Sequence, residues 1–93
     1  MTYKLCPGVV AATICEEHFL IASGEARGKV PYIEGITRPG LYFWKLLEKN
    51  ISVEEIISCA AEDYSVSTDK ADSAFRNFAK SLVNKGYMTF YED

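Results

Sequence analysis

Side chains of the kind that catalysis or metal binding requires are few in this chain of 93 residues. His18 is the only histidine, and neither a nucleophile nor a second pair of metal ligands stands near it in the sequence. Cys15, Glu17 and His18 come nearest to a metal site, but structural zinc takes four ligands. Glu16 and Glu17 are adjacent, so on a strand they would point to opposite faces and not form an acid–base pair. We therefore predict a binding protein and not an enzyme, with no catalytic residue, no metal and no cofactor.

Polar side chains with a spacing that suits binding occur in the last predicted helix. Four of them lie off its apolar stripe: Arg76, Asn77, Lys80 and Asn84. Arg76 and Lys80 are four residues apart and so project from neighbouring positions, where like charges are mildly unfavourable unless an acidic partner is present. In the other interpretation, which stays open, Asp72 neutralises Arg76 and the face is simply solvated.

A second candidate binding segment is the predicted strand from Val30 to Ile36. Pro31 cannot donate a ladder hydrogen bond and Gly35 weakens a strand interior, so this strand is expected at the edge of a sheet. An edge strand presents an open row of backbone donors and acceptors. Tyr32 and Ile33 would either be half-buried in the sheet or contact an added strand.

The elements that must position these residues follow from the apolar periodicity. Two short runs, Val9–Cys15 and His18–Ser23, are separated by the polar Glu16-Glu17 and predict a hairpin ahead of the Val30–Ile36 strand. The short aromatic segment Tyr87–Tyr91 is expected to pack back as a final strand.

Between these strands the period changes to that of helices. Three N-cap residues, Thr37, Ser52 and Ser67, each precede an amphipathic segment, and Gly86 is expected to end the third helix. Several side chains fall on the apolar stripes and are predicted to be buried, among them Trp44, Phe75, Phe78, Ala74, Tyr64 and Cys59.

Composition limits the classes of function. With 48% hydrophobic residues, the chain is long enough for one core, so we predict a single domain over residues 1–93. A formal net charge of −3 lacks the electrostatic footprint of a nucleic-acid-binding protein. Three cysteines without CxxC spacing favour a reduced, cytoplasmic protein, and no apolar run is long enough to cross a membrane.

The predicted order of elements is typical of an α+β fold of the winged helix-turn-helix kind. A three-stranded N-terminal antiparallel sheet would be followed by three helices and a short C-terminal strand. A winged-helix DNA-binding transcriptional regulator is therefore the alternative function. Its recognition helix would need phosphate contacts around it, whereas the expected wing, TFYED, ends in two carboxylates.

Four fragments in this order resemble one known family. They are FLIASGEA, TRPGLYFWKLLEKN, SVEEIISCAAEDYSVS and DSAFRNFAKSLVNKGYM. From Val9 to Met88 the chain resembles the PqqD-like proteins, which serve as peptide chaperones and as recognition elements for ribosomally synthesised, post-translationally modified peptides. Thr37 stands where the family usually has Asn, and Arg38-Pro39 is unusual in that first turn. Glu34 stands where an apolar residue is expected, so the register of its strand is uncertain by one residue.

The resemblance implies a noncatalytic domain that binds the leader of a precursor peptide and presents it to a maturation enzyme, often a radical SAM protein. In the family, the leader adds a strand along the third strand and lies against the third helix. Carried onto this sequence, the peptide-binding residues are Val30, Tyr32, Ile33, Glu34, Ile36, Arg76, Asn77, Lys80 and Asn84. Reversing the charge of Arg76 or Lys80 is then expected to weaken peptide binding. Exposed edge strands also permit a homodimer.

Overall fold

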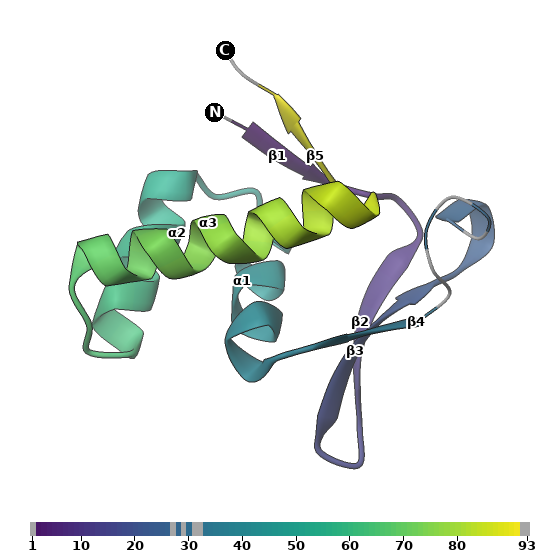
Figure 1. The fold of residues 1–93 in the computed structure, drawn as a ribbon, viewed down its shortest axis with the longest axis horizontal. Coiled ribbons are helices and arrows are strands. Elements are labelled where there is room, and N and C mark those ends of the chain that lie inside the picture. The colour runs from purple at the N-terminus through teal and green to yellow at the C-terminus, as the bar shows by residue number, and fades with distance from the viewer. Residues whose placement is uncertain (1, 27, 29, 31–32, 92–93) are drawn as a thin grey trace.

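The computed structural model describes residues 2–26, 28, 30 and 33–91 and has an α+β, winged-helix-like architecture. A three-stranded antiparallel sheet in the order β2-β3-β4 lies to the lower right of the helices in Figure 1, and a two-stranded sheet of β1 and β5 lies at the top. The helices are α1 (Arg38–Glu48), α2 (Val53–Asp63) and α3 (Thr68–Lys85). The strands are β1 (Thr2–Leu5), β2 (Val9–Ile14), β3 (Glu17–Ala22), β4 (Ile33–Ile36) and β5 (Met88–Tyr91).

The β2–β3 hairpin is present, but its turn lies one residue earlier than predicted. Cys15 and Glu16 form the turn, with φ angles of 51° and 67°. A two-residue hairpin turn of the type that matches strand twist needs positive φ at both central residues. The polar pair Glu16-Glu17 therefore did not give the position of the turn correctly, because Glu17 already belongs to β3 and pairs with Ile14.

The strand β4 is shorter than the predicted Val30–Ile36. It pairs antiparallel with β3 and, within the residues that the structure describes, β3 is its one neighbour, which confirms an edge position. Val30 is buried, at 9% exposure, and its N–H donates to the carbonyl of Ala26 at the end of a short 3-10 helix. Pro31 and Tyr32 lie outside the described residues.

The three predicted helix starts are confirmed by their caps. The hydroxyl oxygens of Thr37, Ser52 and Ser67 each accept the N–H three residues on, at 3.1 Å. Such caps satisfy donors that have no partner inside the helix. Gly86 ends α3 in the left-handed conformation, at φ 90°, as predicted.

The predicted final strand exists as β5, but its partner β1 was not predicted. The two strands pair antiparallel, with Thr2 opposite Tyr91 and Leu5 opposite Met88. The sequence TYKL is too short to reveal a strand by alternation. Pairing arises only because the turn at Gly86 returns the chain past α3 toward its beginning (Figure 1).

The core lies between α1, α3 and the inner face of the three-stranded sheet. Trp44, Phe75 and Leu20 are completely buried there, whereas Phe78 is only half-buried. Three side chains assigned to apolar stripes are exposed instead, so those predictions were wrong: Cys59, Tyr64 and Ala74. The buried stripe of α2 is narrow and is reduced to Ile56 and Ala60, because the helix packs mainly against α3. No helix in the described part of the chain is long and apolar enough to span a bilayer.

Candidate functional site

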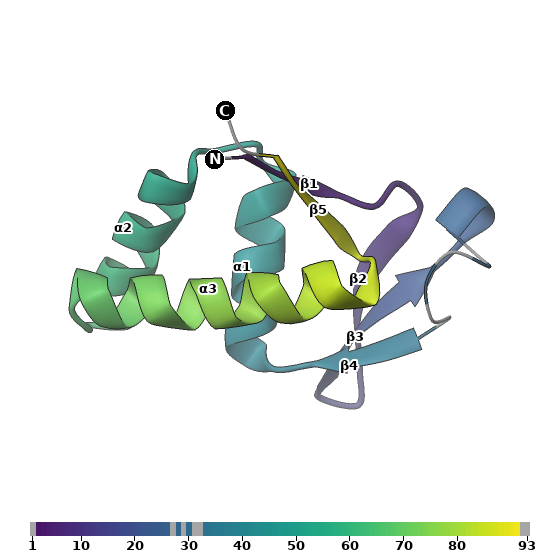
Figure 2. The same cartoon turned by 45° about the horizontal axis from the view of Figure 1, so that its top comes forward.

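A groove with a volume of about 360 Å³ runs between β4 and the C-terminal half of α3. In Figure 2, β4 passes below this half of the helix. The first turn of α1 closes one end of the groove through Thr37, Pro39 and Gly40. Because β4 is an edge strand, the groove adjoins a row of backbone groups that can pair with another chain.

The strand wall of the groove is set by the alternation of side chains along β4. Glu34 and Ile36 are half-buried and line the groove, whereas Ile33 is 48% exposed on the opposite face. Glu34 stands opposite Leu20, which is completely buried, so both belong to the inner face of the sheet. The register that the sequence left uncertain is thereby assigned.

An ion pair explains how a glutamate fits a strand position that faces inward. The Nζ of Lys85 lies 3.0 Å from both carboxylate oxygens of Glu34, and this contact joins the end of α3 to β4. Glu34 is the more buried partner, with its side chain 20% exposed against 46% for Lys85. Burial raises the pKa of the Tyr87 phenol, and the carboxylate of Glu34 raises it further.

The helix wall of the groove repeats at intervals of three and four residues. Its members are Ala74, Asn77, Phe78, Ser81, Leu82 and Lys85. This spacing keeps them on one side of α3, facing β4. The aromatic rings of Phe43 and Phe78 lie 5.6 Å apart at their centroids and both line the groove, which gives it an apolar floor beneath a rim that includes Asn77.

Gly40 lets α1 approach Phe78 closely at this floor. A Cβ atom on Gly40 would lie 3.2 Å from Cε1 and 3.3 Å from Cδ1 of the Phe78 ring, which is tighter than ordinary contact. It would also lie 3.3 Å from the hydroxyl oxygen of Thr37 that caps the helix. The shape of the groove therefore depends on a missing side chain in the first turn of α1.

Of the four polar residues of α3 expected to line the cleft, Asn77 does so. Arg76 lines a different hollow, while Lys80 and Asn84 lie beside Tyr3 on the flank toward β1 and β5. The expected wall was therefore misplaced around the helix. Apolar periodicity shows which stripe is buried, but both of its flanks are polar. Sequence reasoning also missed Ser81 and Lys85, although their spacing from Asn77 was a usable signal.

Comparison with known proteins adds to this geometry. The family model described as "Coenzyme PQQ synthesis protein D (PqqD)" matches residues 35–88, more than half of the chain. The chain belongs to the PqqD family. A search of curated proteins found no match. A solved structure, "TbiB1 in Complex with the TbiA(beta) Leader Peptide", is 29% identical, with a TM-score of 0.75. The alignment covers 97% of this chain and 99% of that one.

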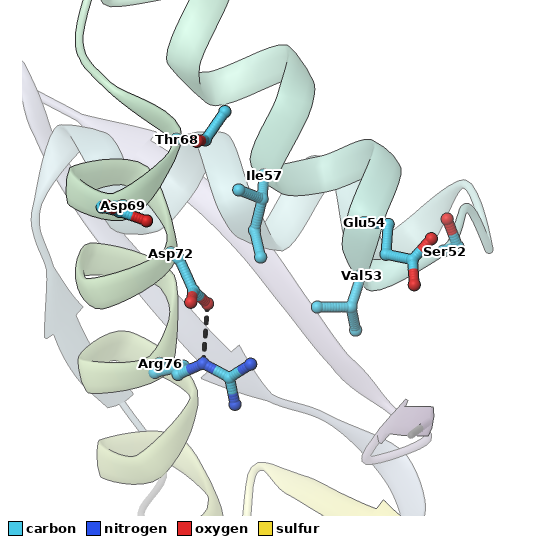
Figure 3. A pocket seen from close by; sticks show the side chains of 8 residues that line it. All are labelled: Ser52, Val53, Glu54, Ile57, Thr68, Asp69, Asp72 and Arg76. Atoms are coloured by element: carbon cyan, nitrogen blue, oxygen red, sulfur yellow. Dashed lines mark hydrogen bonds and ion pairs between the residues drawn. The ribbon is translucent and has the colours of Figure 1, made fainter.

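This PqqD-family chain has a second hollow, of about 560 Å³, between the N-terminal halves of α2 and α3. Figure 3 shows Val53 and Ile57 on the α2 side, with Asp69, Asp72 and Arg76 along α3. The Nε of Arg76 lies 2.6 Å from a carboxylate oxygen of Asp72, so this charge is already paired within the helix. The two segments predicted to bind a peptide meet at the β4 groove and not here.

His18 and Cys15, the residues nearest to a metal site in the sequence, do not form one with their surroundings. Across residues 2–26, 28, 30 and 33–91 the structure holds no group of three histidine, cysteine or acidic side chains that could bind a metal. The Nδ1 of His18 lies 2.9 Å from the hydroxyl oxygen of Thr13 on the paired strand. Both side chains stabilise the hairpin.

Proposed function

We propose that this chain is a noncatalytic chaperone that binds the leader of a ribosomally synthesised precursor peptide and presents it to a maturation enzyme, such as a radical SAM protein. The observation that carries the proposal is a groove of suitable shape directly beside the free edge of β4. The PqqD family and the likeness to a protein in complex with a leader peptide support it.

Strand addition along β4 is the binding mode that the site favours. The leader's backbone would pair with the edge of Ile33–Ile36, which supplies affinity independent of sequence. Alternate side chains of an added strand would enter the groove and supply specificity. The floor of Phe43 and Phe78 suits apolar side chains, whereas the end at Lys85 is polar.

The electrostatics of α3 support a peptide ligand over the DNA alternative. Arg76 is paired with Asp72 and Lys85 with Glu34, so two of the cations on this helix are already neutralised. The chain carries a net charge of −3. Affinity for a duplex rests largely on free Lys and Arg at the phosphates.

A matched pair of substitutions on one helix tests the proposal. Asn77 lines the groove and Asn84 lies on the other flank, so Asn77→Arg and Asn84→Arg place the same side chain in two environments. The probe is a fluorescein-labelled peptide covering the leader half of the precursor encoded beside the gene, followed by anisotropy. We expect Asn77→Arg to weaken binding about tenfold or more, equivalent to about 1.4 kcal/mol, and Asn84→Arg to leave it within about twofold.

Three other outcomes would contradict this assignment. Loss of affinity in Asn84→Arg alone would place the peptide on the flank of Lys80, as the sequence first indicated. Unchanged binding by a peptide with proline in its paired stretch would contradict strand addition, because proline lacks the ladder donor. Binding of a duplex oligonucleotide in place of the peptide would favour the DNA-binding alternative.

A further inference from the structure

Gly35, in the middle of β4, is a glycine that the fold itself does not require. Its φ is not in the left-handed region, and a Cβ atom there would meet no heavy atom within 4 Å. Gly8 shows the contrast, since it has a φ of 89° and its Cβ would lie 2.5 Å from the carbonyl oxygen of Ser23. Glycine inside a strand loses more conformational entropy on folding and contributes no packing. Such a glycine often marks close approach by a ligand or another backbone.

A side chain at Gly35 would face away from the core, on the same face of the sheet as Ile33, although the backbone of Gly35 also borders the β4 groove. Across the sheet, Gly35 stands opposite Phe19, and the neighbouring Ile33 stands opposite Ile21. Phe19 and Ile21 are half-buried, and Ile33 is 48% exposed. The missing side chain at Gly35 therefore leaves open space at the free edge of β4, on the face of the sheet that carries Phe19 and Ile33, and this space is called the notch below.

We propose that this notch is a subsite for one outward-facing side chain of the bound leader, and that this side chain is bulky and apolar, with an aromatic ring fitting best. The inference rests on the proposed function. A strand added along β4 lies about 4.8 Å away and must place one residue beside Gly35 with its side chain on this outer face. An aromatic ring packed across strands onto an edge glycine covers its exposed backbone.

Position favours the leader over other occupants of this apolar face. The notch lies at the edge that the added strand would occupy, so the leader's own side chain is the first group to reach it. The leader would then be read on both faces of the sheet. Residues opposite Glu34 and Ile36 would enter the groove, and the residue between them would cover Gly35.

The test fills the notch with a side chain and measures the effects on peptide affinity and on melting temperature separately. Gly35→Val adds bulk where the structure has open space, and valine favours strands, so we expect the melting temperature to stay the same or rise. Ala12→Val is the matched control, because Ala12 stands on the other side of Phe19 on the same face of the sheet. Gly35→Ala serves as a second variant if valine lowers the melting temperature.

The probe is the leader half of the precursor encoded beside the gene, with each residue replaced in turn by Phe, Ala or Asp. In the wild-type protein, we expect one position, between two groove-facing ones, to prefer Phe over Asp by about tenfold or more. Gly35→Val should weaken the unmodified peptide about tenfold and remove that one preference, while Ala12→Val should leave both within about twofold.

Other results would contradict the notch, its occupant or the proposed function, and the assay distinguishes among them. Full binding by Gly35→Val, or an equal loss at every peptide position, would overturn the notch but leave the groove as the site. Dissociation of a wild-type homodimer by Gly35→Val in the absence of peptide would assign the face to a second copy and overturn the inference. If the wild-type protein binds none of the peptides, the proposed function fails first.

Discussion

Replacing Gly40 with alanine is expected to destabilise the wild-type protein but to stabilise a variant that lacks the Phe78 ring. In the wild type, the new Cβ would lie 3.2 Å from Phe78, so the ring must shift by a few tenths of an ångström. Overpacking of this kind costs about 1–3 kcal/mol. Alanine gains up to about 1 kcal/mol over glycine in a helix interior and less in the first turn. The expected net loss in free energy of unfolding is about 1 kcal/mol.

In the Phe78→Ala background the crowding by the ring is absent, and the helix propensity of alanine is opposed only by the close approach to Thr37. Gly40→Ala should then raise the free energy of unfolding by about 0.5 kcal/mol. The coupling energy of the double-mutant cycle is therefore expected to be about 1.5 kcal/mol. The close approach to Thr37 occurs in both backgrounds, so its effect cancels in the cycle.

Equilibrium urea unfolding of the wild type, Gly40→Ala, Phe78→Ala and the double variant measures this cycle. The comparison requires that the four proteins have equal m-values. If Gly40→Ala had the same effect on stability in both backgrounds, the added Cβ would not be crowding the Phe78 ring, and this explanation of the glycine would be wrong. Peptide affinity is a second readout. Gly40 and Phe78 both line the groove, so an added Cβ and a displaced ring change its shape, and the leader peptide should bind more weakly to this variant even where stability changes little.

Three further predictions concern stability. Burial and the hydrogen bond that its hydroxyl donates to Asp63 raise the pKa of Tyr42 above its ordinary value of 10.0. Ionisation above pH 10 therefore favours the unfolded chain, and Tyr42→Phe should reduce the loss of stability measured between pH 9 and pH 11; an unchanged slope would contradict this. Gly86→Ala should cost about 1–2 kcal/mol in urea unfolding because φ there is 90°, whereas a neutral effect would mean that the helix ends differently. Ser67→Ala should cost about 1 kcal/mol through loss of the cap on α3, and Thr68→Ala, at the next residue, is its control.

Local chemistry accounts for what could be predicted from the sequence. A cap such as Ser67 and a terminator such as Gly86 act on their own neighbours, so the starts of the helices and the end of α3 were predictable. The hairpin was predictable in kind, but its turn depended on positive φ at Cys15 and Glu16, which neither residue type signals. The pairing of β1 with β5 joins the two ends of the chain and leaves no local pattern.

The apolar periodicity of α3 and the residues Pro31 and Gly35 were enough to predict a buried stripe and an edge strand ahead of the helices. Which polar flank of α3 faces that strand depends instead on how the helix packs in the folded protein. Asn77 and Lys80 are equally far from burial by helical periodicity, yet Asn77 lines the groove and Lys80 does not. The rotation of a helix against a sheet is fixed by long-range packing, here of Phe75 and Leu82 in the core and of Lys85 on Glu34.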